Sequence, residues 1–185
     1  MSRLILVTGG SRSGKSAFGQ SLAESLPGPR VFVATCPVID PEMNERIRRH
    51  REARTGRGWE TIEEPLELAE AFRRAAGHAV VLVDCLTLWI NNAMYAAEQS
   101  GADLSEDDIA RRARAVVDAA RAHGGTVLFI TNEVGMGIVP ESPLGRRFRD
   151  LAGRANQIFG NGCDEVYLAV CGQILQIKPN SSQHL

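Results

Sequence analysis

The chain contains 185 residues, of which 44% are hydrophobic and 23% charged, proportions that are ordinary for a globular protein with one core. Its 21 basic and 22 acidic residues leave a net charge of −1, which argues against a nucleic-acid partner and against a polybasic membrane surface. The longest apolar runs are far shorter than the roughly 20 residues that a membrane-spanning helix needs. We therefore expect one domain over residues 1–180, followed by a frayed tail at 181–185.

The cysteines and the first residues of the chain bear on its compartment. None of the cysteines shows metal-ligand spacing, and they stand at Cys36, Cys85, Cys163 and Cys171. Such cysteines indicate reduced thiols, and no apolar signal-peptide core precedes the first glycines. These observations predict a cytoplasmic protein.

Short apolar runs alternate with longer segments of helical spacing. Continuous apolar runs of this kind are typical of strands buried on both faces, and they lie at residues 3–8, 30–35, 79–84, 126–131 and 165–170. The alternation predicts an α/β fold with a mostly parallel sheet flanked by helices. Residues 171–178 are expected to form a C-terminal antiparallel hairpin that turns at Gly172.

Residue types that cap helices mark three helix starts. Asp40 and Ser142 each precede a proline, which suits the first helical position. Ser105 begins the sequence Ser-Glu-Asp-Asp, the pattern of a capping box with an acidic first turn. Gly124 and Gly125 are expected to end that helix.

The segment from Gly9 to Ser16 fits the pattern G-x-x-x-x-G-K-[ST] and lies between a predicted strand and a predicted helix at 17–26. Its glycines let backbone N–H groups face phosphate oxygens, and the helix start adds a favourable dipole. We expect Lys15 to reach the β- and γ-phosphates of a nucleotide and Ser16 to ligate Mg²⁺. The alternative is a chance loop rich in glycine and serine, which the flanking strand and helix disfavour.

Residues 41–54 form a predicted helix rich in arginine, in which Arg46, His50 and Arg54 share one face. Clustered arginines disfavour a charge on His50, so its imidazole is expected to be neutral and nucleophilic. Flanking guanidinium groups can bind a polyphosphate. From spacing alone, however, the favoured alternative is a solvated basic helix with an incidental histidine. The other histidines are expected to be structural or solvated, namely His78, His123 and His184.

Asp84 follows the apolar run at 80–83, at the sheet edge where ligands of α/β proteins bind. It is expected to hold Mg²⁺ directly or through water. The alternative is that Asp84 caps the helix that begins after it. On that helix, Trp89, Met94 and Tyr95 serve either a subunit contact or the core, and we favour the core.

Several motifs, in this order along the chain, resemble one known family. They are GGSRSGKS at 9–16, ATC at 34–36, DPEMNERIRRHREAR at 40–54, WETIEE at 59–64, VDCLTLW at 83–89 and TNEVGMGIVPE at 131–141. Together they resemble the bifunctional adenosylcobinamide kinase / adenosylcobinamide-phosphate guanylyltransferase family of cobalamin biosynthesis. The likeness extends to about Lys178, and the combination of motifs is specific.

The resemblance implies a P-loop NTPase-type, RecA-like fold and two reactions. In the first, ATP or GTP phosphorylates the aminopropanol hydroxyl of adenosylcobinamide. In the second, GTP transfers GMP to that phosphate through a guanylyl-histidine, and the family's nucleophilic histidine matches His50, which reverses the interpretation from spacing. The nucleotide-binding residues that the resemblance implies are Gly9, Gly10, Ser11, Arg12, Ser13, Gly14, Lys15, Ser16, Ala34, Thr35, Cys36, Arg51, Glu52, Ala53, Arg54, Glu63 and Asp84.

The resemblance also implies partners and assembly. These are Mg²⁺ with GTP and ATP, a corrinoid small molecule, no nucleic acid, and a homotrimer with active sites near the subunit interfaces. The glycine-containing loop at 132–141 is then a wall of the corrinoid pocket or a subunit contact, with Glu133 as a candidate general base. A structural turn is the alternative for this loop.

Two other functions stay open from the residues alone. One is a plain P-loop kinase for another small alcohol, with His50 incidental. The other is a P-loop ATPase or GTP-dependent switch that binds nucleic acid or a protein. The net charge and the confinement of the basic cluster to residues 46–57 disfavour the second. A covalent guanylyl adduct would separate the bifunctional enzyme from both.

Overall fold

The computed structural model describes residues 2–36, 48, 52 and 54–179 of the chain. The helix predicted over 41–54, with its start at Asp40 and with His50, therefore lies mostly outside the described residues, as does the tail at 181–185. Within the described part, no helix combines the length and apolarity needed to cross a membrane.

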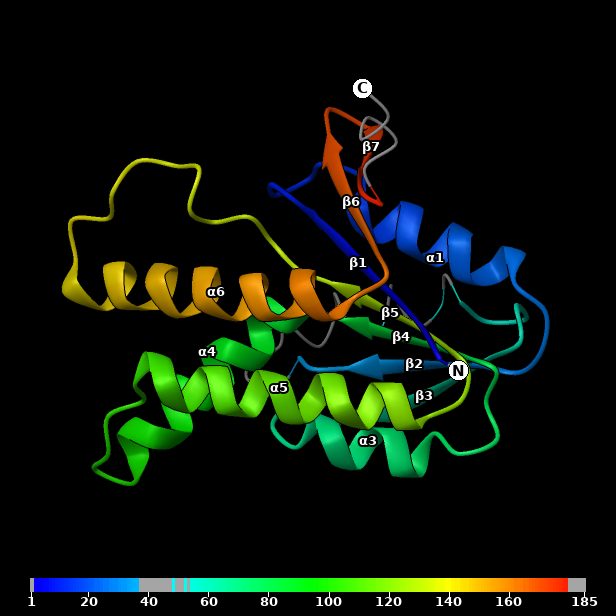
Figure 1. Ribbon diagram of the computed structural model, residues 1–185, viewed down its shortest axis with the longest axis horizontal. Helices are drawn as coiled ribbons and strands as arrows, with labels where there is room; N and C mark the ends of the chain where they lie inside the picture. The colour runs from blue at the N-terminus through cyan, green and yellow to red at the C-terminus, as the bar shows by residue number, and fades with distance from the viewer. Residues whose placement is uncertain (1, 37–47, 49–51, 53, 180–185) are drawn as a thin grey trace.

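A seven-stranded sheet forms the centre of the molecule (Figure 1). Its strand order is β3-β2-β4-β5-β1-β6-β7, and every neighbouring pair is parallel except β6 and β7. The strands are β1 (Arg3–Gly9), β2 (Arg30–Ala34), β3 (Trp59–Glu63), β4 (Val80–Asp84), β5 (Thr126–Ile130), β6 (Glu165–Val170) and β7 (Gln173–Lys178). The predicted mostly parallel sheet and C-terminal hairpin are confirmed.

Helices cover both faces of the sheet. They are α1 (Lys15–Ser25), α3 (Leu68–Arg74), α4 (Leu86–Gln99), α5 (Glu106–Ala122) and α6 (Pro143–Gly162). Helix α1 packs on one face against alternate residues of β1, β4 and β5, and α3, α4, α5 and α6 pack on the other face against the intervening residues. Because both faces are covered, the central strands are apolar throughout, which is the pattern that revealed them.

Two helix starts match the capping patterns. The Ser105 hydroxyl accepts a hydrogen bond from the Asp108 amide, and the Asp108 carboxylate accepts one from the Ser105 amide, so the capping box is confirmed. The Ser142 hydroxyl accepts from the Gly145 amide, with Pro143 as the first helical residue. Both caps satisfy amides that would otherwise lack a partner at a helix start.

Two local features differ from the sequence-based expectation. Strand β3 was not predicted, because it is an edge strand with three polar residues and no continuous apolar run. Trp89 is in the core, as expected, and its indole N–H donates to the Leu66 carbonyl at 2.8 Å. The preference for the core was wrong for Tyr95, which is 62% exposed on α4, whereas Met94 is partly buried.

Candidate nucleotide site

The phosphate turn, residues 9–16, joins the C-terminal end of β1 to the first turn of α1. Lys15 is the first residue of α1 and is buried, and its Nζ donates to the Gly10 carbonyl at 3.0 Å. The Ser13 hydroxyl is also buried and has no hydrogen-bond partner among the described residues. A buried ammonium and an unsatisfied hydroxyl inside one tight turn suit a polyphosphate, which can accept hydrogen bonds from both.

Two glycines make the phosphate turn sterically feasible. Gly14 has φ 98°, a left-handed conformation that a residue with a Cβ adopts only at a cost. A Cβ on Gly9 would lie 2.4 Å from the Ala169 carbonyl oxygen and 2.7 Å from Ser13 Oγ. The turn is therefore packed directly against the end of β6.

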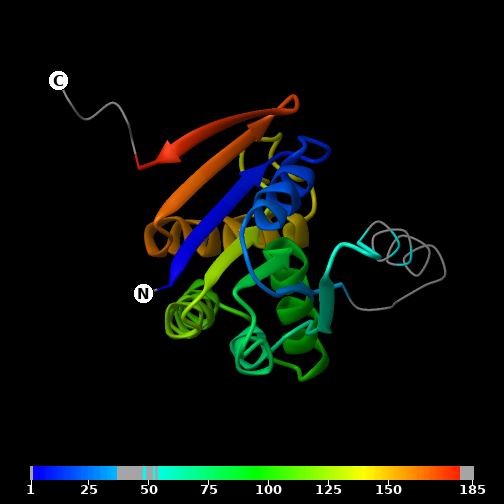
Figure 2. The ribbon, with the colours of Figure 1, turned by 90° about the vertical axis from the view of Figure 1, so that its right-hand side faces the viewer.

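The turn between β6 and β7 braces the phosphate turn. The Gly172 amide donates to the Ser13 carbonyl at 3.0 Å, and a Cβ on Gly14 would lie 3.4 Å from the Gly172 Cα. Figure 2 shows the β6–β7 hairpin, in orange and red, beside β1 and near the start of α1. The C-terminal hairpin thus supports the phosphate turn, a role that its sequence did not indicate.

Asp84 ends β4, and β5 separates β4 from β1. Its backbone is in register with Ala34 of β2 and Ile130 of β5, so its half-buried carboxylate lies at the same edge of the sheet as the phosphate turn. The N-cap of α4 is Cys85, without a side-chain cap, so the alternative that Asp84 caps this helix is wrong. Burial, and next the nearby Asp84 charge, raise the pKa of the Cys85 thiol to about 11.

Thr35 fastens the end of β2 to the end of β4. Its hydroxyl donates to the Cys85 carbonyl and accepts from the Cys85 amide, both at 2.8 Å, and the side chain is fully buried. Asn92 of α4 donates to the Thr35 carbonyl at 2.8 Å and to the Pro65 carbonyl at 3.0 Å. Thr35 therefore sets the position of the Asp84–Cys85 backbone, and the role of Asn92 was not indicated by the sequence.

A second polar network holds the chain as it leaves β5. The Thr131 hydroxyl donates to Asn156 Oδ1 at 2.8 Å, and Asn156 Nδ2 donates to the Asn132 carbonyl at 3.1 Å. The Asn132 amide donates to the Thr87 hydroxyl at 2.8 Å. Both backbone groups of Asn132 are thus fixed by side chains from α4 and α6, next to β1. The sequence analysis missed this network, although a polar residue directly after a buried strand is a signal that could have indicated it.

Glu133 lies against the phosphate turn through its backbone. Its amide donates to the Gly9 carbonyl at 3.1 Å, and its carboxylate accepts from the Gly135 amide at 3.1 Å. The carboxylate therefore stabilises its own loop in this structure. That contact supports the structural-turn interpretation of residues 132–141.

The other predicted residues that the structure describes lie apart from the phosphate turn. Glu63 ends β3, four strands away from β1, which is roughly 19 Å at the usual strand spacing. Ala34 ends β2, which is one strand closer, and Thr35 and Cys36 follow it. Glu52 is exposed and pairs with Arg48, whereas His50, Arg51 and Ala53 lie outside the described residues. The structure thus brings together the phosphate turn and Asp84, and places a second group around the ends of β2 and β3.

Arg54, at the start of this second group, is buried rather than exposed to solvent. Its guanidinium carbon lies 3.6 Å from the centre of the Phe32 ring, and the residue is 5% exposed. Two of the other histidines are engaged structurally: His123 Nε2 lies 2.9 Å from the His78 carbonyl, and His78 Nε2 lies 3.1 Å from Glu60, whereas His184 lies outside the described residues.

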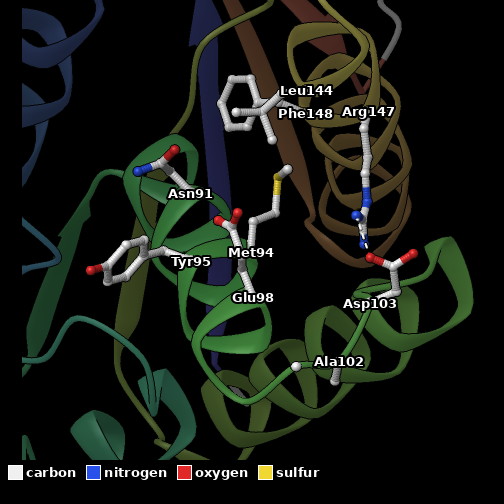
Figure 3. A pocket seen from close by; sticks show the side chains of 10 residues that line it. Asn91, Met94, Tyr95, Glu98, Ala102, Asp103, Leu144, Arg147 and Phe148 are labelled. Atoms are coloured by element: carbon white, nitrogen blue, oxygen red, sulfur yellow. Dashed lines mark hydrogen bonds and ion pairs between the residues drawn. The ribbon is translucent and has the colours of Figure 1, made fainter.

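A cavity of about 470 Å³ lies between α4 and α6, away from the phosphate turn (Figure 3). Met94 and Phe148 line it, and the Arg147–Asp103 ion pair, 2.7 Å long, lies on one side. Large apolar side chains around this end of the molecule are exposed, namely Tyr95, Met136, Ile138, Val139 and Leu144. Tyr95 belongs to α4, Met136, Ile138 and Val139 to the loop between β5 and α6, and Leu144 to the first turn of α6, and these segments lie on the left side of Figure 1. We call these five side chains the apolar platform.

Comparison with known proteins adds to this geometry. Residues 5–177 match the family described as cobinamide kinase / cobinamide phosphate guanyltransferase. The chain is 37% identical over 185 residues to the bifunctional adenosylcobalamin biosynthesis protein CobU of Escherichia coli, covering 95% of this chain and 99% of that protein. It is 35% identical to the bifunctional adenosylcobalamin biosynthesis protein CobP of Pseudomonas aeruginosa, covering 94% and 96%.

A solved structure supports the fold independently. A KaiC-like protein from Pyrococcus horikoshii superposes with a TM-score of 0.51 at 15% identity, over 90% of this chain and 70% of that one. At this identity the likeness concerns the fold alone.

Proposed function

The chain belongs to the cobinamide kinase / cobinamide phosphate guanyltransferase family, and from this premise we propose that it catalyses both reactions in cobalamin biosynthesis. ATP or GTP first phosphorylates the aminopropanol hydroxyl of adenosylcobinamide. GTP then donates GMP to that phosphate. The observation that carries the proposal is the phosphate turn, in which Lys15, the Ser13 hydroxyl and the start of α1 converge.

In the kinase step, the substrate hydroxyl oxygen attacks the γ-phosphorus, the bond to the β–γ bridging oxygen breaks, and the hydroxyl proton leaves to solvent or a base. Lys15 and the backbone amides of residues 9–16 neutralise the charge on the phosphates. Ser16 and Asp84 supply a hydroxyl and a carboxylate, hard oxygen donors of the kind that bind Mg²⁺ together with nucleotide phosphates. When bound, the ion would neutralise charge on the nucleotide.

In the guanylyl step, a ring nitrogen of His50 attacks the α-phosphorus of GTP and pyrophosphate leaves. A phosphate oxygen of the substrate then attacks the same phosphorus, and the bond to the histidine breaks. Transfer through a histidine divides one difficult displacement into two easier ones. Arg51, Arg54 and Glu63 are proposed nucleotide contacts for this step, with Ala34, Cys36, Glu52 and Ala53 beside them.

The proposed partner is a corrinoid, with no nucleic acid, in the cytoplasm. The net charge of −1 supports the proposal that no nucleic acid is bound. No disulfide joins the four cysteines, all of which lie in the described part of the chain, and this supports a reducing compartment. We also propose a homotrimer, because the apolar platform offers a surface that a second subunit can bury.

Mass spectrometry after incubation with Mg²⁺ and GTP tests the proposed function. We expect one GMP to attach covalently to the wild-type protein, labelled from α-³²P-GTP and not from γ-³²P-GTP, in an acid-labile and alkali-stable bond. His50→Ala should lose the adduct and retain nucleotide binding, because the phosphate turn is unchanged. His123→Ala is the matched control. If the wild-type protein binds GTP but forms no covalent GMP adduct, guanylyl transfer is contradicted and the plain kinase is the function that stays.

A further inference from the structure

The chain enters strand β3 through a fixed segment at residues 54–59. Arg54 is buried with its guanidinium on the Phe32 ring, and the Arg57 amide donates to the Arg54 carbonyl at 3.2 Å. The Trp59 ring meets the same Phe32 ring edge-on, with centroids 6.3 Å apart. One aromatic side chain of β2 therefore contacts both ends of this segment.

Glu24, near the end of α1, holds the segment from the other side. Its carboxylate accepts from Trp59 Nε1 at 3.0 Å and from Gln20 Nε2 at 2.9 Å, and lies 3.5 Å from Arg57 Nη1. Hydrogen bonds to the charged form favour a carboxylate, and the pKa of Glu24 is lowered despite the opposing effect of its burial. We call Glu24, Phe32, Arg54, Arg57 and Trp59 the Glu24 anchor.

Helix α1 links the Glu24 anchor to the phosphate turn. Glu24 lies nine residues after Lys15 on the same helix, which is about 13.5 Å along its axis. Arg30 fastens the end of this helix by donating to three of its carbonyls, those of Ala23, Glu24 and Leu26. The anchor therefore has a fixed position relative to the phosphate turn.

His50 precedes Arg54 by four residues, so its Cα lies within about 15 Å of the Arg54 Cα whatever the conformation between them. We propose that the Glu24 anchor positions the His50 segment for guanylyl transfer, and that Glu24 and Trp59 are positioning residues for this step. The inference rests on the proposed function. The kinase step draws on the phosphate turn and Asp84, so it does not need the anchor.

Two variants test the anchor. Glu24→Ala removes the acceptor for both the indole and Arg57, and Trp59→Phe removes the indole N–H while keeping a ring against Phe32. For each we would measure the single-turnover rate of labelling by α-³²P-GTP, and kcat and KM for γ-phosphate transfer to adenosylcobinamide. Labelling should slow about tenfold or more in both variants, because small misplacements of a reacting group are costly. The kinase constants should stay within about twofold of wild type.

Matched controls separate positioning from general destabilisation. Glu165→Ala removes a carboxylate that also accepts two side-chain hydrogen bonds, from Arg3 and Tyr167, on β6, four strands from β2 in the sheet. Trp89→Phe likewise removes a buried indole donor, one that lies on α4 and outside the Glu24 anchor. Both should label at the wild-type rate. Glu24→Gln keeps an acceptor for the indole and should restore most of the labelling.

The outcomes distinguish this inference from the proposed function. A wild-type protein that takes no α-label overturns both. Labelling at the wild-type rate in Glu24→Ala and Trp59→Phe overturns the anchor alone. An equal fall in labelling and kinase turnover, matched by Glu165→Ala, also overturns it, because it would show a purely structural role.

Discussion

Two adjacent glycines in the phosphate turn differ in what they tolerate. A Cβ on Gly9 would approach the Ala169 carbonyl oxygen to 2.4 Å, whereas one on Gly10 meets nothing within 4 Å. Gly9→Ala should therefore lower the free energy of unfolding by about 3 kcal/mol, since backbone must move, and Gly10→Ala should change it by less than about 0.5 kcal/mol. Urea denaturation of both variants measures the difference. Equal losses would contradict the close packing of β6 on the turn.

Single residues were predictable where a motif dictates local geometry. The phosphate turn is an example, because its glycines, lysine and serine are required at fixed positions in one short segment. Arg54 is the opposite case. Its helical spacing with His50 was visible in the sequence, but its stacking on Phe32 depends on which strand lies beneath that segment, and spacing along one helix carries no such information.

Helix α4 contributes to the site at the level of elements. It starts at Leu86, two residues after Asp84, and its Asn92 holds two carbonyls, those of Thr35 and Pro65. Asn92→Ala should lower the free energy of unfolding by about 2–3 kcal/mol. Asn92 is buried, and without its amide group the two carbonyls lose their hydrogen-bond donor. Asn91→Ala is the matched control, since Asn91 is exposed on the same helix. Calorimetry that shows no difference between these variants would refute the role of Asn92.

Elements were predictable where burial is symmetrical. Strands β1, β4 and β5 are covered on both faces and therefore read as continuous apolar runs. Strand β3 lies at the edge, with Glu60, Thr61 and Glu63 exposed, so it gave no such run. The strand order was not predictable either, because it depends on contacts between segments far apart in the chain.

At the scale of the whole molecule, the apolar platform bears on assembly. We expect light scattering to give about three times the 20.1 kDa of the chain. Leu144→Glu should dissociate the trimer, because a charge would be buried at the contact. Leu175→Glu, at a leucine equally exposed on β7, should leave it intact. A monomeric wild-type protein, or equal dissociation by both variants, would contradict the proposed contact.

The position of β1 in the interior of the sheet has a consequence for synthesis. Its two neighbours, β5 and β6, begin at Thr126 and Glu165, and the turn that braces the phosphate loop follows at Gly172. At ordinary translation rates the ribosome reaches residue 165 about 8–30 s after starting. The phosphate turn is thus synthesised early, whereas the strands and the turn that pack against it are synthesised last. A nascent chain that stops short of Gly172 carries the whole motif but lacks its brace.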